Sequence, residues 1–205
     1  MVDPTVNPRS PFAGFSLAAA KGKSGVIVAD RDGLGIATVL PRKGQTRALE
    51  QRVSAHFGIE LPRGPRRETA GGTAFVGTAP EAWLTTCELG GNAFALSLRE
   101  VIGDLASVSD QSDGYAVLRL TGLKLRDTLA KIIPIDLHPR AFRPGDVAST
   151  AALQIGATLW RLEDGPDGSP MFDIAVFRSL TGSLWHALSE SAAEVGLVMA
   201  CPRRC

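Results

Sequence analysis

The sequence has few cysteines, no long apolar segment and almost no net charge. Its three cysteines are an odd number in 205 residues, which argues against the disulfide framework of a small secreted protein. No apolar run approaches the ~18 residues needed to span a bilayer. A total of 22 basic and 21 acidic residues leaves a formal charge of +1, without the basic excess typical of a nucleic-acid-binding protein. These absences predict a soluble globular protein in a reducing compartment.

Catalytic and cofactor-binding motifs are also absent. Residues 22–24 read Gly-Lys-Ser, the end of a phosphate-binding loop, but Leu17 stands where that loop requires glycine. The Gly-Leu-Gly run at 33–35 lacks the third glycine of a dinucleotide-binding fingerprint. Cys201 and Cys205 lack the second pair of ligands that a structural zinc site requires. The residues therefore indicate no catalytic, cofactor-binding or metal-binding site in this chain.

Charge is distributed unevenly along the chain. Residues 1–67 contain 11 Lys or Arg and 5 Asp or Glu, whereas residues 68–205 contain 11 and 16. A basic N-terminal part could dock an acidic partner, because a surface of one sign steers encounter and fixes register. The alternative is a solvated helix face followed by a basic loop, which is the commoner fate of surface charge.

Hydrophobic periodicity predicts strands and helices in alternation. Residues 25–29 and 34–40 are apolar runs joined by an Asp-Gly turn sequence, so they are expected to form a hairpin. An apolar stripe over residues 49–57 predicts a helix that ends at Gly58. The Pro-, Gly- and Arg-rich stretch 61–72 is expected to be an exposed loop or an interdomain connection.

The rest of the chain continues this rhythm. Further strands are predicted at 75–77, 82–87, 115–120, 153–160 and 172–177, and helices at 94–105, 123–133 and 180–188. The last two strands alternate with period 2, as expected for strands that cover a core on one side. Hairpins interleaved with single helices predict the α+β class, with helices packed on one face of antiparallel sheets.

The strongest local polar signal is the segment Asp136-Leu137-His138-Pro139-Arg140-Ala141-Phe142. It places an acid, an imidazole and a guanidinium around a proline that fixes φ, which predicts a rigid polar loop. Asp136 could orient His138 as an acid–base pair, or Arg140 could bind a carboxylate. Alternatively, the same groups bond to the backbone and lock a turn.

A family resemblance depends on this loop and on three other segments. The runs Tyr115-Ala-Val-Leu-Arg-Leu-Thr-Gly122, Asp136 to Phe142 with Pro144-Gly145, Phe172-Asp-Ile174 and Ser183-Leu-Trp-His186 resemble the gamma subunit of heterotetrameric sarcosine oxidase. The resemblance covers roughly residues 25–195. It implies an α+β fold with ferredoxin-like β-α-β units, as in aminomethyltransferase (glycine-cleavage T protein) domains.

The resemblance also implies a role in a bacterial cytoplasmic complex of alpha, beta, gamma and delta subunits. That complex oxidatively demethylates sarcosine to glycine and passes the one-carbon unit to tetrahydrofolate. In the family, FAD, FMN and NAD belong to alpha and beta and zinc to delta, while gamma has no assigned catalytic residue and binds no cofactor. Two alternatives are a stand-alone folate-binding protein of the aminomethyltransferase type and an assembly that acts on another N-methyl amine, such as dimethylglycine.

For this chain the resemblance implies a structural subunit with contacts to its partners. Asp136, His138, Arg140, Phe142 and Trp185 are the expected interface or structural-loop residues, because Trp and Arg anchor interfaces more often than their abundance suggests. The expected organisation is an arm at 1–24, one aminomethyltransferase-like domain at 25–195 with a sub-boundary at 61–72, and a tail at 196–205.

Overall fold

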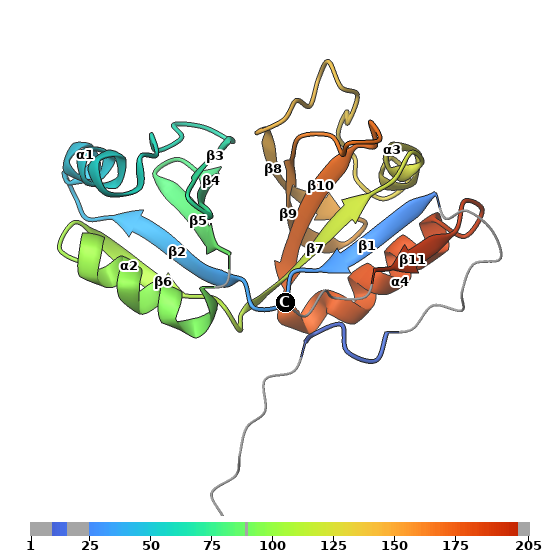
Figure 1. The fold of residues 1–205 in the computed structure, drawn as a ribbon, viewed down its shortest axis with the longest axis horizontal. Coiled ribbons are helices and arrows are strands. Elements are labelled where there is room, and N and C mark those ends of the chain that lie inside the picture. The colour runs from blue at the N-terminus through green and yellow to red at the C-terminus, as the bar shows by residue number, and fades with distance from the viewer. Residues whose placement is uncertain (1–9, 16–24, 89, 201–205) are drawn as a thin grey trace, which may run out of the picture.

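The computed structural model describes residues 10–15, 25–88 and 90–200, which form two sheets that face each other (Figure 1). The six-stranded sheet has the strand order β11-β1-β7-β10-β9-β8, and the five-stranded sheet has the order β3-β4-β5-β2-β6. The six-stranded sheet contains β1 (Val26–Asp30), β7 (Tyr115–Thr121), β8 (Val147–Ala152), β9 (Ile155–Arg161), β10 (Met171–Phe177) and β11 (Leu197–Met199). The five-stranded sheet contains β2 (Gly35–Pro41), β3 (Arg67–Ala70), β4 (Thr73–Ala79), β5 (Ala82–Cys87) and β6 (Ala106–Asp110).

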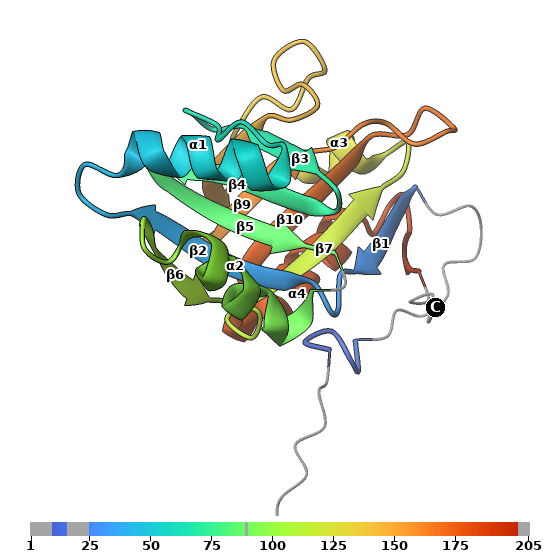
Figure 2. The ribbon, with the colours of Figure 1, turned by 60° about the vertical axis from the view of Figure 1, so that its left-hand side comes forward.

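Helices cover the outer face of each sheet (Figure 2). Helices α1 (Thr46–Phe57) and α2 (Phe94–Ile102) pack on the five-stranded sheet, and α3 (Leu125–Leu129) and α4 (Thr181–Ser191) pack on the six-stranded sheet. Short 3₁₀ turns at Gly91–Ala93 and Arg178–Leu180 precede α2 and α4. This arrangement confirms the predicted α+β class, with helices on one face of antiparallel sheets.

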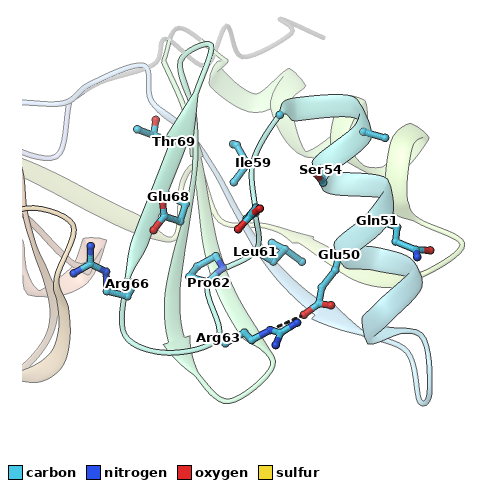
Figure 3. A pocket seen from close by; sticks show the side chains of 13 residues that line it. Glu50, Gln51, Ser54, Ile59, Leu61, Pro62, Arg63, Arg66, Glu68 and Thr69 are labelled. Atoms are coloured by element: carbon cyan, nitrogen blue, oxygen red, sulfur yellow. Dashed lines mark hydrogen bonds and ion pairs between the residues drawn. The ribbon is translucent and has the colours of Figure 1, made fainter.

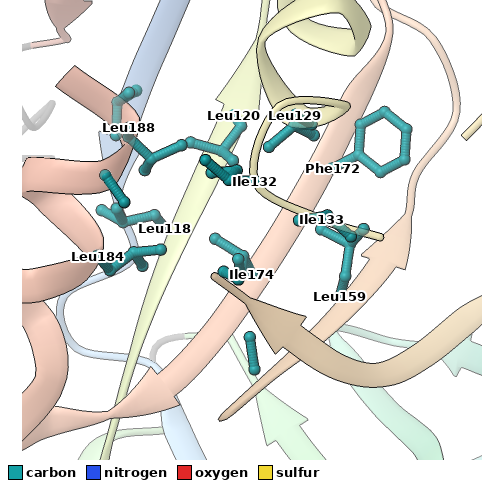
Figure 4. Packing of buried hydrophobic residues seen from close by; sticks show 14 of the residues in the cluster. Leu118, Leu120, Leu129, Ile132, Ile133, Leu159, Phe172, Ile174, Leu184 and Leu188 are labelled. Atoms are coloured by element: carbon teal, nitrogen blue, oxygen red, sulfur yellow. The ribbon is translucent and has the colours of Figure 1, made fainter. Parts of the chain in front are cut away.

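The largest core lies between the six-stranded sheet and the helices α3 and α4 (Figure 4). Leu118 and Leu120 of β7 and Ile174 of β10 point to this side, and Leu129 and Leu184 meet them from the helices. All five side chains are fully buried, and each contributes about 1.5–3 kcal/mol by leaving water. A second core of the same kind joins α1 and α2 to the five-stranded sheet.

A third cluster lies between the two sheets. Val76 and Leu84 of the five-stranded sheet pack with Val117, Trp160 and Ala175 of the six-stranded sheet. The period-2 pattern of β9 and β10 had indicated a core on one side only. The second face is in fact also buried along most of β10 and at Trp160 of β9, because these residues pack against the other sheet.

The expected hairpin of residues 25–29 and 34–40 is wrong. The local reversal does form, with Leu34 N–H donating to the Arg31 carbonyl at 3.2 Å and Gly33 at a φ of +83°. The flanking strands nevertheless belong to different sheets, since β1 pairs with β7 and β11 whereas β2 pairs with β5 and β6. Turn chemistry reverses the chain here, but long-range pairing decides which strands become neighbours.

Three segments that the sequence analysis expected as a loop, an arm and a tail contain residues with defined positions. Stretch 61–72, expected as a loop or connection, contains β3, which pairs antiparallel with β4 at the edge of the five-stranded sheet. Phe12, in the expected arm, is 2% exposed and packs into the largest core. Strand β11 pairs parallel with β1 and extends the six-stranded sheet past residue 195.

Asp30 provides a pH-dependent test of this fold. Its carboxylate accepts a hydrogen bond from Ser10 Oγ, and burial raises its pKa above the ordinary 3.8 although Ser10 opposes this. The folded state therefore binds this proton more tightly than the unfolded chain, and the contribution of Asp30 to the free energy of unfolding falls as pH rises above 3.8. We expect Asp30→Asn to melt at a higher temperature than wild type at neutral pH and to lose this advantage below pH 3.8.

Thermal melts over this pH range check the expectation. Asp113→Asn, at an exposed turn residue, is the matched control and should follow the wild-type curve. A parallel profile for Asp30→Asn and wild type would contradict the assigned effect of burial.

Candidate functional site

The 136–142 loop holds its polar groups against its own backbone. Asp136 Oδ1 accepts the backbone N–H of His138 at 2.8 Å, and His138 Nδ1 accepts the backbone N–H of Arg140 at 3.2 Å. The His138 carbonyl accepts the N–H groups of Ala141 and Phe142, each at 2.9 Å. Asp136 thus bonds to the backbone of His138 and not to its ring, so the geometry favours the locked turn over the acid–base pair.

The exposed side of this loop and its buried anchor have different roles. Asp136, His138 and Arg140 are exposed, whereas Phe142 is buried and stacks on Phe172 with ring centroids 6.1 Å apart. The Arg140 guanidinium has no hydrogen bond or ion pair to any described residue. The loop therefore presents a free cation on a rigid turn whose base is fixed in the core.

Trp185 lies on the last helix, as the sequence analysis expected, with its side chain mostly buried. It is 7% exposed on α4, and its ring stacks on Phe15 with centroids 5.8 Å apart. The chain's own residues cover most of the indole, and its expected contact with a partner chain stays a prediction. Its spacing with Leu184 and Leu188 marked it as part of a core-facing helix.

Sequence reasoning missed a charged cluster between the two sheets. Arg119 of β7 donates to Asp173 of β10 through two bonds, Nε to Oδ1 at 2.8 Å and Nη2 to Oδ2 at 2.9 Å. Arg31 pairs with Glu88, and Arg67 of β3 is in electrostatic contact with both pairs. The sequence did contain a signal for this pair, because each of the two apolar runs includes one charged residue, at 119 and at 173. Opposite charges at such positions predict an ion pair if the two strands are neighbours.

An open groove of about 1090 Å³ lies between α1 and β3 (Figure 3). Glu50 and Arg63 pair across it at 3.3 Å, and Arg66 pairs with Asp146. Ser54 and Glu68 line the same groove from the helix and the strand. It is therefore a polar surface whose arginines already have acidic partners.

The described residues contain no group of three His, Cys, Asp or Glu side chains arranged to hold a metal ion. The Gly-Lys-Ser run at 22–24 and the cysteines at 201 and 205 lie outside the described residues. Within the parts of the chain that are described, no helix is both long and apolar enough to cross a membrane.

Sequence comparisons with known proteins agree on one family. Residues 43–194 match the sequence model of the sarcosine oxidase, gamma subunit family. The sarcosine oxidase subunit gamma of Corynebacterium sp. (strain U-96) is 31% identical over 95% of this chain and 97% of its own length. The protein of the same name from Corynebacterium sp. (strain P-1) is 30% identical over 95% and 96%.

Solved structures agree with these sequence matches. A chain of the heterotetrameric sarcosine oxidase from Corynebacterium sp. U-96 superposes with a TM-score of 0.77 at 25% identity, over 92% of this chain and 96% of that chain. The glycine cleavage system aminomethyltransferase T from Bartonella henselae shares the fold, with a TM-score of 0.62 at 14% identity, over 86% of this chain and 48% of that one. The chain therefore belongs to the sarcosine oxidase gamma subunit family.

Proposed function

We propose that this chain is the gamma subunit of a heterotetrameric sarcosine oxidase, in which it has a structural and assembly role beside alpha, beta and delta subunits in the cytoplasm. The observation that carries the proposal is the near full-length structural match to one chain of such a complex. The match to aminomethyltransferase T supports a shared fold only, because this chain spans about half of that protein.

In this proposal the complex oxidises the N-methyl group of sarcosine, releases glycine and transfers the one-carbon unit to tetrahydrofolate. FAD, FMN, NAD and zinc are held by the other subunits. A structural role for this chain is supported by the buried ion pair of Arg119 and Asp173, which joins two neighbouring strands of the six-stranded sheet. The chain positions its partners and contributes no group to the reacting atoms.

Affinity purification of the tagged full chain from its native bacterium tests the proposal. The expected eluate contains three further chains and shows a flavin absorption spectrum. A colourless eluate with this chain alone, under conditions that preserve complexes, would contradict the proposal. Titration with a reduced folate would then test the stand-alone folate-binding alternative, which requires saturable binding by the isolated chain.

Arg140 offers a specific test of the assembly role. Its exposed guanidinium lies on a turn whose backbone is already fixed by Asp136 and His138. Little backbone entropy is therefore lost when a partner carboxylate binds it. We expect Arg140→Ala to reduce the co-purifying partner chains several-fold, as for an interface arginine. Arg42→Ala, at another exposed arginine, is the control, and equal recovery for both variants would remove Arg140 from the interface.

A further inference from the structure

Buried N–H donors without acceptors gather between the two sheets. Nε of Arg31, Nε of Arg67 and Nε1 of Trp160 are inaccessible to solvent and have no hydrogen-bond partner among the described residues. Arg67 is opposite Val76 in the β3–β4 register, and Val76 packs with Trp160 between the sheets. Because these groups are all donors, the complementary ligand is one that supplies oxygen acceptors.

The charges in this space are also unbalanced. Asp173 uses both carboxylate oxygens for Arg119, and Glu88 pairs with Arg31. Arg67 is left as a third guanidinium without a carboxylate of its own. Burial lowers the pKa of Arg67, and the charges of Arg119 and Arg31 lower it further, although the charges of Asp173 and Glu88 oppose this. A partly buried cation without a paired anion is costly, so an additional carboxylate would stabilise this site.

A row that contains two exposed apolar side chains, Ile27 and Val198, lies on the same face of the six-stranded sheet. Val198, Ile27, Thr121 and Met171 are neighbours in register across β11, β1, β7 and β10. The start of β1 lies at the side of the molecule away from the five-stranded sheet (Figure 1). Ile27 is 37% and Val198 36% exposed, whereas Trp160 and Asp173 in the neighbouring row are buried. An apolar segment that covered this row would bring its neighbouring residues close to the Arg119–Asp173 pair.

We propose that a segment of a partner subunit docks on this face of the six-stranded sheet, with apolar side chains over Ile27 and Val198 and an Asp or Glu carboxylate paired with Arg67. The inference rests on the proposed function and names the surface through which the chain assembles. A polypeptide carboxylate is favoured over a small free anion because the row of Ile27 lies one register step from the row of Arg119 and Asp173, with which Arg67 interacts electrostatically. A single docked segment can therefore cover the row and reach the charged cluster.

A competitive assembly experiment tests whether Arg67 contributes to binding of the partner subunit. Wild-type and variant chains with different tags are co-expressed with the partner subunits, and their ratio in the purified complex is measured. We expect Arg67→Met to be at least tenfold under-represented, because it leaves the partner's carboxylate unpaired. Arg63→Met, which removes an exposed arginine on the outer side, should be incorporated equally. Equal incorporation of Arg67→Met would overturn the inference.

Cross-linking distinguishes a docking defect from a folding defect. The Arg67→Lys complex is treated with a carbodiimide, which joins the introduced amine to a neighbouring carboxylate with loss of water. We expect a cross-linked peptide between position 67 and an Asp or Glu of a partner subunit. A link only to Glu88 or Asp173 of the same chain, or none, would overturn the inference whatever the competition shows. If the wild-type chain recruits no partners at all, the proposed function fails first.

Discussion

Asp173→Asn is expected to lower the free energy of unfolding of the chain by about 3 kcal/mol. The side chain of Asp173 is 5% exposed, and both of its oxygens accept bonds from Arg119. Burial alone would lower the pKa of Arg119, but the hydrogen bond and charge of Asp173 outweigh this and raise it. Without that charge, Arg119 and Arg67 become two cations with no full counter-ion between the sheets.

Urea unfolding of the single and double variants measures this effect. The side chain of Arg119 is 28% exposed, so solvent screening places the cost at the lower end of about 3–5 kcal/mol for a broken buried pair. A double variant, Arg119→Met with Asp173→Leu, should regain most of the loss because both members of the pair are then replaced by apolar side chains, and only Arg67 remains without the charge of Asp173. A double variant less stable than Asp173→Asn would contradict the explanation.

Gly122→Ala is expected to destabilise the chain by about 3 kcal/mol, through backbone strain and overpacking together. Gly122 has a φ of +127°, which side-chain-bearing residues rarely adopt. A Cβ at this position would lie 2.2 Å from the Gly25 carbonyl oxygen, where β1 and β7 meet. The backbone of one strand must therefore shift to admit a methyl group.

A second glycine separates conformational strain from crowding. Gly44 also has a positive φ, +77°, but a Cβ there meets no atom within 4 Å. Gly44→Ala should therefore cost only about 1 kcal/mol. Equal losses for the two variants in urea unfolding would show that crowding against Gly25 does not contribute.

The sequence alone determined the features that depend on local physics. The stripe over 49–57 and the glycine after it predicted α1, which ends with Gly58 in the left-handed conformation at a φ of +67°. The acid and proline in the 136–142 loop made a locked turn one of the alternatives open from the sequence. The structure favours that alternative, because Asp136 accepts a hydrogen bond from within its own turn. The resemblance carried by that loop also identified the family that the comparisons show.

Only the tertiary structure decided which strands are neighbours and therefore which charges meet. Strand β1 pairs with β7 and with β11, both distant in sequence, and not with β2 after the turn. Arg119 and Asp173, 54 residues apart, become a bonded pair through the β7–β10 register, and Arg67 joins them from the opposite sheet. Local propensity favours the extended conformation of a strand. Which strand it pairs with depends on how well its two faces are buried in the folded chain. For that reason the inter-sheet site could not be read from the periodicity of any single strand.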